Sequence, residues 1–170
     1  ATSGILAALV HRNKTGEGQK VDTSLFEAGI VHTYWQSAIA GATGESPGPL
    51  GSAHPLTAPY QAFKTKDKWI TVGASNQNTW LMLLKSIDRM DLQENEMFSS
   101  NFNRKENITQ LVEILNSELI KKTSKEWLKI FDDNGLPCGP INSINEMFVD
   151  PQTIEREMII DVDNKKAGKS

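Results

Sequence analysis

Residues 60–76 read YQAFKTKDKWITVGASN, and this stretch decides the fold that we predict from the sequence. Two short runs rich in aromatic and β-branched residues, Tyr60–Thr65 and Trp69–Gly73, flank a polar Lys-Asp-Lys turn. Two such runs joined by a short polar turn predict a β-hairpin. Ser75-Asn76 then offers N-cap side chains, so the chain is expected to pass from strand to helix within this stretch.

The residues after the hairpin predict a mostly helical structure. Apolar residues recur at helical spacing between Ile108 and Leu119, which is typical of a helix with one buried face. Residues 136–142, LPCGPIN, predict a stiff loop, and residues 158–162 predict a last strand. Four helix starts are predicted from capping residues, one of them with a proline at the first turn: Asn76, Thr123, Ser143 and Asp150.

The residues before the hairpin predict helix, strand and helix in turn. Residues 5–14 have helical spacing, residues 20–25 alternate as in a strand, and residues 26–41 fit an amphipathic helix. Residues 41–59 are rich in Gly, Pro and Ser, which indicates a connection or a functional loop. An apolar helix is already under way at Ala1 with no cap ahead of it, so we expect the chain to be the central part of a longer protein.

The composition narrows the class of protein. The 170 residues carry a formal net charge of -3, so we expect no nucleic-acid partner, which would need a basic patch. No apolar run approaches the roughly 20 residues that span a bilayer, so we expect no membrane partner. The location is expected to be cytoplasmic, or the mitochondrial matrix in a eukaryote. The single cysteine, Cys138, belongs to no zinc-type spacing; we expect it to be a buried apolar residue and the chain to hold no metal.

Several local runs resemble one known family. They are GILAALVHRNKTGEGQKVDTSLFEA, GSAHPLTAPYQAFKTKDKWITVGASN, EWLKIF with NGLPCGPINSINEMFVDP, and the weaker MIIDV…GK. In order and spacing they resemble the central part of a family III CoA-transferase, the CaiB/BaiF group that includes formyl-CoA, carnitine and glutarate CoA-transferases. The run PYQAFKTKD…VGA is most similar to members that act on dicarboxylic acids.

The resemblance implies an α/β plus α+β fold in two pieces. Residues 1–45 would belong to a Rossmann-like large domain that binds CoA, and residues 46–57 would be a linker that forms an active-site loop. Residues 58–150 would be a small α+β domain with the hairpin and several helices, and residues 151–170 a return linker. Because two chains interlock in the family, and because large apolar helix faces need partners, we expect a homodimer or a higher oligomer.

The resemblance also implies the chemistry. Family members transfer coenzyme A between carboxylic acids through an aspartyl anhydride and an aspartyl-CoA thioester, without a metal. Their nucleophilic Asp lies shortly ahead of the residue that matches Ala1. We therefore expect no catalytic nucleophile in the chain and no activity from the chain alone. The expected substrates are acyl-CoA and a carboxylic acid, with dicarboxylic acids favoured.

Five residues match substrate-binding positions of the family. Leu25 matches a position that lines the CoA pocket, and Gly51, Ser52, Ala53 and His54 match a loop that closes over the reacting acyl group. Small residues in such a loop let backbone N–H groups approach an anhydride oxygen. His54 has a second interpretation, in which its ring only hydrogen-bonds backbone and holds the connection.

Two other functions stay open at this point. An α-methylacyl-CoA racemase shares the fold but removes a proton beside the thioester carbonyl, which needs an acid/base pair. The GxxHP run at residues 51–55 favours the transferase over the racemase. The third reading is a non-catalytic interaction module, which should begin and end at caps and expose little apolar surface.

Two further expectations are structural. The family has Asp-Gly where this chain has Asp67-Lys68, and a lysine with positive φ costs about 1 kcal/mol or more, so the hairpin turn should be of another type. All four tryptophans lie on apolar faces and are expected in a core: Trp35, Trp69, Trp80 and Trp127.

Overall fold

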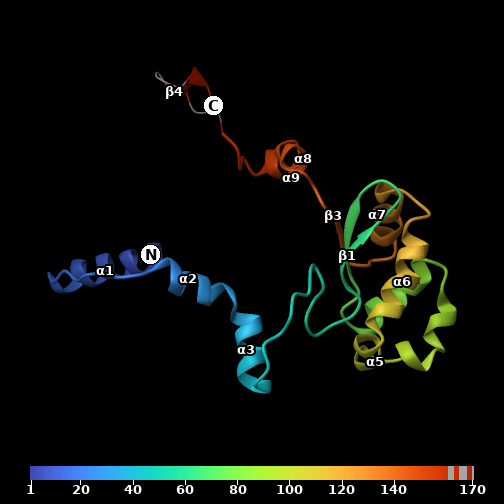
Figure 1. Ribbon diagram of the computed structural model, residues 1–170. Helices are drawn as coiled ribbons and strands as arrows, with labels where there is room; N and C mark the ends of the chain where they lie inside the picture. Colours follow the sequence, from blue (N-terminus) through green and yellow to red (C-terminus); the bar gives the residue numbers. More distant parts are fainter. Residues whose placement is uncertain (161–162, 165–167, 170) are drawn as a thin grey trace. The chain divides into compact units, whose positions relative to one another are not determined.

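The computed structural model describes residues 1–160, 163–164 and 168–169, and the chain divides into two compact units (Figure 1). We call Ala1–Pro49 the N-terminal unit and Leu50–Ser170 the C-terminal unit, and each is described by itself. The N-terminal unit contains α1 (Thr2–Thr15), α2 (Leu25–His32) and α3 (Tyr34–Thr43). The strands of the C-terminal unit are β1 (Tyr60–Lys64), β2 (Trp69–Gly73), β3 (Cys138–Pro140), β4 (Asp163–Asn164) and β5 (Gly168–Lys169). Its helices are α4 (Gln77–Ser86), η1 (Met90–Gln93), η2 (Glu96–Phe98), α5 (Asn101–Glu106), α6 (Ile108–Leu119), α7 (Ser124–Asp133), α8 (Ile144–Phe148) and α9 (Pro151–Glu155).

The strand predicted over residues 20–25 is wrong. Residues 17–24 have no regular structure, and α2 begins at Leu25, inside the predicted strand. The reason is a capping box at the end of the alternating polar and apolar residues that suggested a strand. Glu27 N donates to Ser24 Oγ at 3.1 Å, and Ser24 N donates to Glu27 Oε2 at 2.7 Å. These two bonds satisfy orphan N–H groups and commit the chain to a helix at this point.

The helix predicted over residues 26–41 is in fact two helices, α2 and α3, that meet at Thr33. Thr33 Oγ1 donates to Ile30 O at 2.7 Å and lies 2.7 Å from Ser37 Oγ. A β-branched hydroxyl residue that bonds to a preceding carbonyl competes with the helical ladder, which accounts for the break. The second helix continues past Gly41 to Thr43, and Gly44 caps it with a left-handed φ of 76°.

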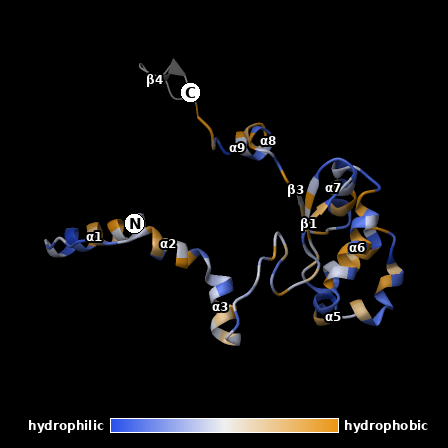
Figure 2. Cartoon of the chain, viewed as in Figure 1, coloured by the Kyte–Doolittle hydropathy of each residue, from blue (hydrophilic) through white to orange (hydrophobic). Residues whose placement is uncertain are grey.

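None of the side chains of α1, α2 and α3 is buried within the N-terminal unit. Orange apolar residues alternate with polar ones along these helices in Figure 2. Trp35, which was expected in a core, is 45% exposed, and no side chain of α3 is buried. The large exposed apolar residues of this unit are Ile5, Leu6, Leu9, Val10, Val21, Leu25, Phe26, Ile30, Val31, Tyr34 and Trp35.

The C-terminal unit contains the predicted hairpin and one strand that the sequence analysis missed. β1 pairs antiparallel with β2, and Phe63 lies opposite Ile70. β3 pairs antiparallel with the other edge of β2, so the stretch predicted as a loop at residues 136–142 is partly a strand. Its prolines suggested a loop, yet proline is tolerated on an edge strand, where one side of the backbone needs no partner.

One face of this sheet packs on helices, and the contact forms the core of the unit. Inward-facing Phe63, Ile70 and Val72 are buried, whereas Trp69 on the other face is 50% exposed and the expectation that it lies in the core is wrong. Trp80 and Trp127 are buried as predicted. The predicted stripe of α6 is confirmed, because Leu111, Leu115 and Leu119 are all buried. The rest of the core is Ala74, Leu83, Leu84, Ile87, Leu92, Phe98, Phe131 and Leu136.

The four predicted helix starts are confirmed. Capping boxes form at Asn76, Thr123 and Ser143, and Asp150 caps α9 with a proline in its first turn. The last predicted strand is not found in its described part, since residues 158–160 have no strand structure; residues 161–162 lie outside the described residues. The mixed α/β class agrees with the prediction. A parallel, Rossmann-like sheet is not found among the described residues.

The hairpin turn is organised by Asp67, which also joins it to α7. Asp67 Oδ1 accepts hydrogen bonds from Ser124 N at 2.7 Å, Lys68 N at 2.8 Å and Thr65 Oγ1 at 2.9 Å. The bond from the Ser124 backbone is the main cause that lowers the pKa of Asp67 to about 2. Lys68 does not have a positive φ, so the turn differs from an Asp-Gly turn, as expected.

Candidate active-site loop

The loop Leu50–Pro59 leads into β1 and contains four of the five expected substrate-binding residues. It begins with a turn closed by a bond from Ala53 N to Leu50 O at 3.0 Å. Gly51 has a φ of 59°, and a positive φ at the first central residue alone is the signature of a type II′ turn. Nothing lies within 4 Å of a Cβ built on Gly51, so the position requires glycine for its backbone conformation and not for space.

The turn presents backbone donors. Within the described part of the chain, the N–H groups of Gly51 and Ser52 have no hydrogen-bond partner. The Ser52 side chain fastens the turn to the sheet, since Ser52 Oγ accepts from Ala62 N at 3.1 Å. Two adjacent N–H groups on a fastened turn can stabilise negative charge on an oxygen atom.

His54 holds the second half of the loop. Its Nδ1 accepts hydrogen bonds from Leu56 N at 3.1 Å and Thr57 N at 3.2 Å, and its backbone N donates to Tyr60 O at 2.9 Å. The imidazole stacks on the Tyr60 ring with centroids 5.2 Å apart and an interplanar angle of 2°. Because Nδ1 is an acceptor, the proton of the neutral ring is on Nε2. The interpretation of His54 as a residue that hydrogen-bonds loop backbone is confirmed. A role of His54 in binding substrate stays a prediction.

Helix α5 also contacts the loop, and no pattern in the sequence predicts this contact. Asn101, Arg104 and Lys105 all reach loop backbone. Their spacing of i, i+3 and i+4 puts them on one helix face. Polar residues at this spacing ordinarily indicate a solvated face, so the sequence alone carried no signal for this contact.

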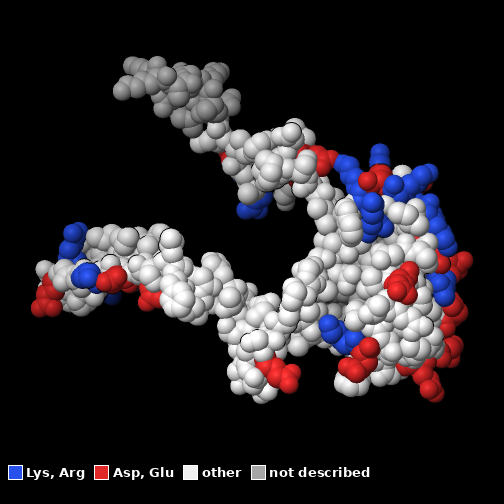
Figure 3. Space-filling view, viewed as in Figure 1, with Lys and Arg blue, Asp and Glu red and all other residues white. Residues whose placement is uncertain are grey.

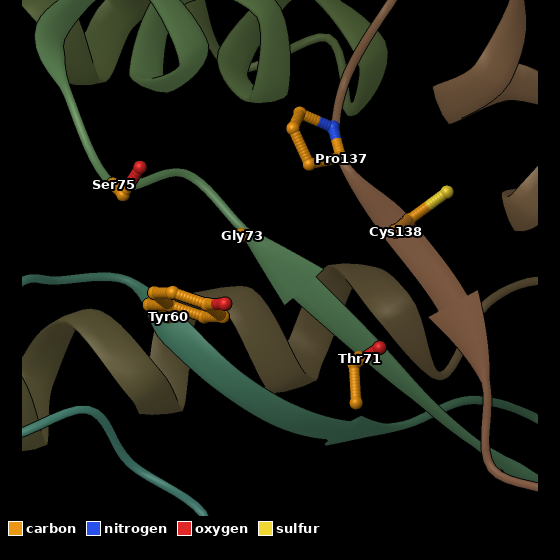
Figure 4. A pocket seen from close by; sticks show the side chains of 6 residues that line it. All are labelled: Tyr60, Thr71, Gly73, Ser75, Pro137 and Cys138. Carbon is orange, nitrogen blue, oxygen red and sulfur yellow. The ribbon is translucent and has the colours of Figure 1, made fainter. Parts of the chain in front are cut away.

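A shallow cavity of about 250 Å³ lies beside the stacked ring of Tyr60, and Figure 4 shows its lining. No cationic side chain lines it. The Cys138 thiol points away from Tyr60 and Thr71 in Figure 4, and Sγ lies 4.0 Å from Leu128 O. Burial raises the pKa of Cys138, so the thiol is a poor nucleophile. Cys138 is half-buried, so the expectation of a buried apolar residue is met only in part. The remaining lining residues are Gly73, Ser75 and Pro137.

Leu25, the fifth expected residue, belongs to the N-terminal unit. It is the first residue of α2 and is 93% exposed there. The structure therefore brings Gly51, Ser52, Ala53 and His54 together in one loop, while Leu25 is described only within its own unit.

Basic side chains gather on one part of the C-terminal unit. Figure 3 shows Lys and Arg side chains gathered over the tip of the β1–β2 hairpin and the neighbouring part of α7.

In the described ranges, no group of three or more His, Cys, Asp or Glu residues is placed to hold a metal ion. Among the same residues, no helix is long and apolar enough to cross a membrane.

Comparison with known proteins gives matches over the entire length. The family model described as CoA-transferase family III matches residues 1–170. The human succinyl-CoA:glutarate CoA-transferase is 31% identical over 169 residues, which are 99% of this chain and 39% of that protein. The acetyl-CoA:oxalate CoA-transferase of Acetobacter aceti is 31% identical, with 92% of this chain and 40% of that protein covered.

A solved structure of a family member has a similar fold. A CaiB/BaiF family protein from Brucella suis superimposes with a TM-score of 0.78 at 29% identity, covering 98% of this chain and 47% of that one. The chain thus spans about two fifths of the length of the curated relatives that it matches.

Proposed function

Because the chain belongs to CoA-transferase family III, we propose that it is part of an enzyme that transfers coenzyme A from an acyl-CoA to a free carboxylic acid. The observation that carries this proposal is the family match over residues 1–170. A hydrogen-bonded loop at residues 50–59 supports it, because the sequence of that loop resembles the family's acyl-covering loop. Relatives named for succinate, glutarate and oxalate transfer support small dicarboxylic acids as the substrate class.

The proposed reaction is double displacement on an aspartate that, by the family resemblance, precedes Ala1. Its carboxylate attacks the thioester carbonyl, the C–S bond breaks, and CoA leaves as a thiolate to give a mixed anhydride. The thiolate attacks the aspartyl carbonyl, which releases the donor acid and leaves an aspartyl-CoA thioester. The acceptor acid repeats these steps in reverse order. All bonds are exchanged between acyl groups, so the proposed reaction needs no metal or redox partner.

The loop residues have proposed roles in these steps. Each attack places negative charge on a carbonyl oxygen, and the N–H groups of Gly51 and Ser52 are the proposed donors to it. Ala53 is proposed to leave room for the backbone to approach, and His54 is proposed to contact the acyl group. Leu25 is proposed to line the CoA pocket.

The test is an isotope-exchange assay with succinyl-CoA and labelled glutarate or oxalate. We expect the complete polypeptide, including the segment that carries the aspartate, to form the labelled acyl-CoA, and the 170-residue chain alone to form none. Transfer by the chain alone would contradict the proposed origin of the nucleophile.

The same assay separates the other candidate functions. Deuterium exchange at the carbon beside the thioester carbonyl of 2-methylacyl-CoA, without CoA transfer, would favour the racemase. Absence of both reactions in the complete polypeptide would favour an interaction module.

A further inference from the structure

Helix α5 forms hydrogen bonds to the backbone of the candidate loop at every second residue, namely His54, Leu56 and Ala58. Asn101 Nδ2 donates to Leu56 O at 2.9 Å, and Asn101 Oδ1 accepts from Ala58 N at 3.0 Å. Arg104 Nε donates to Ala58 O at 2.8 Å. Lys105 Nζ donates to the carbonyl of His54 itself at 3.3 Å. One face of a six-residue helix therefore fixes the segment from His54 to Ala58 by four hydrogen bonds.

The helix is in turn fixed to the core by a fully buried guanidinium. Arg104 is 0% exposed, its Nη1 donates to Phe98 O at 2.9 Å and Gln77 Oε1 at 3.1 Å, and its charge lies 5.0 Å from the centre of the Trp80 ring. None of these partners is a carboxylate, and burial lowers the pKa of Arg104. Burying a charge without an ion partner is costly, so simple core filling does not explain an arginine here.

The guanidinium contributes several N–H donors that are held in one plane and point in fixed directions. Its planar donors reach carbonyls from the loop and from η2 at once, which an apolar side chain of the same size could not do. The loop segment is thereby tied to the rigid core and not only to the neighbouring strand. Loops that must place donors within a fraction of an ångström of a reacting atom need such support, because a shift of about 1 Å can cost about 100-fold in rate.

We propose that α5 is the positioning element of the active-site loop, with Asn101 as its principal positioning residue: it sets where the N–H groups of Gly51 and Ser52 stand relative to the acyl group. This inference rests on the proposed function, since the loop must contact substrate for its placement to matter. Asn101 does not touch the reacting atoms and acts only through the backbone it holds.

The experiment compares Asn101→Ala with Asn103→Ala in the complete polypeptide. Asn103 is a matched control, because it lies on the same helix with similar exposure but donates to Glu96 O and Ser99 Oγ, away from the loop. Two readouts are taken: amide hydrogen exchange of residues 54–58, and steady-state kinetics of CoA transfer. Asn101→Asp is the second variant: it keeps an acceptor for Ala58 N but replaces the donor to Leu56 O with a carboxylate oxygen, which repels that carbonyl.

For Asn101→Ala we expect loop amides to exchange about ten times faster and kcat to fall about 10- to 100-fold, with KM for acyl-CoA changed less than about twofold. Asn101→Asp should also show faster loop exchange and a lower kcat than the wild type, because its carboxylate oxygen repels Leu56 O. Asn103→Ala should match the wild type in both readouts. Should Asn101→Ala fail to fold, the Asn101→Asp comparison carries the test.

Two results overturn the proposal: unchanged loop exchange in Asn101→Ala, or faster exchange with unchanged kcat. Absence of any transfer by the folded wild type is a different failure. It overturns the proposed function and with it the catalytic purpose of α5, while the exchange data still report whether α5 holds the loop.

Discussion

At the scale of single residues, the candidate loop depends on backbone conformation more than on side-chain chemistry. Gly51 has a left-handed φ of 59° with open space around its missing side chain. Ser52 and His54 use their side chains to bond loop or strand backbone. The family resemblance located these residues, but their local role follows only from the hydrogen bonds.

Gly51 gives the first prediction. Gly51→Val should destabilise the loop by about 1–2 kcal/mol, because a β-branched residue strongly disfavours positive φ, whereas Gly51→Asn should cost clearly less. Under the proposed function, kcat should fall for valine and largely persist for asparagine. Chemical unfolding and transfer kinetics check this. Equal losses in both variants would show that side-chain bulk matters at Gly51, contrary to the open space around it.

At the scale of elements, the joint between the hairpin turn and α7 gives a prediction on pH. Asp67 has its pKa lowered from 3.8 to about 2 in the folded protein, chiefly by the Ser124 N–H. A carboxyl group with a lowered pKa stabilises the folded state at pH values above its pKa in the unfolded chain. That stabilisation disappears as the pH falls through its pKa in the folded protein.

Asp67→Asn should therefore melt at a lower temperature than the wild type at pH 7, and the difference should shrink as the pH falls from 3.8 towards 2. Asp133→Asn is the control, because Asp133 forms an exposed pair with Lys129 along α7 and should change the melting temperature little. Thermal unfolding across this pH range gives the answer. A constant difference between Asp67→Asn and the wild type would exclude ionisation of Asp67 as its cause.

Sequence patterns predicted the elements whose signals are local. The hairpin, the stripe of α6 and the caps at Asn76, Thr123 and Ser143 are confirmed, because each depends on residues within a few positions. β3 escaped prediction because its strand character comes from pairing with β2, far away in sequence. The strand at residues 20–25 failed because the capping box at Ser24 outweighed a short alternation.

Part of the candidate site could be predicted from the sequence and part of it could not. Gly51–His54 could be found through a family resemblance, but the contact of α5 with that loop could not. Asn101 bonds residues more than forty positions away, and such pairing leaves no periodic signal in one sequence.

At the scale of the whole molecule, the exposed apolar side chains of α1, α2 and α3 lead us to expect self-association. Phe26→Lys places a charge among these residues and should shift the chain towards monomer in analytical ultracentrifugation. The control is Phe102→Lys on α5 of the C-terminal unit, since Phe102 is 71% exposed and Phe26 is 77% exposed. Equal association of both variants and the wild type would mean that α2 is not part of the interface.

We propose that these residues serve a thioester exchange whose carboxylate nucleophile, by the family resemblance, precedes Ala1. The most direct measurement is mass spectrometry of the complete polypeptide after brief incubation with succinyl-CoA. We expect a covalent adduct on an acidic residue ahead of Ala1, with a mass increase equal to that of coenzyme A less one water. An adduct within residues 1–170, or transfer without any adduct to the polypeptide, would contradict it.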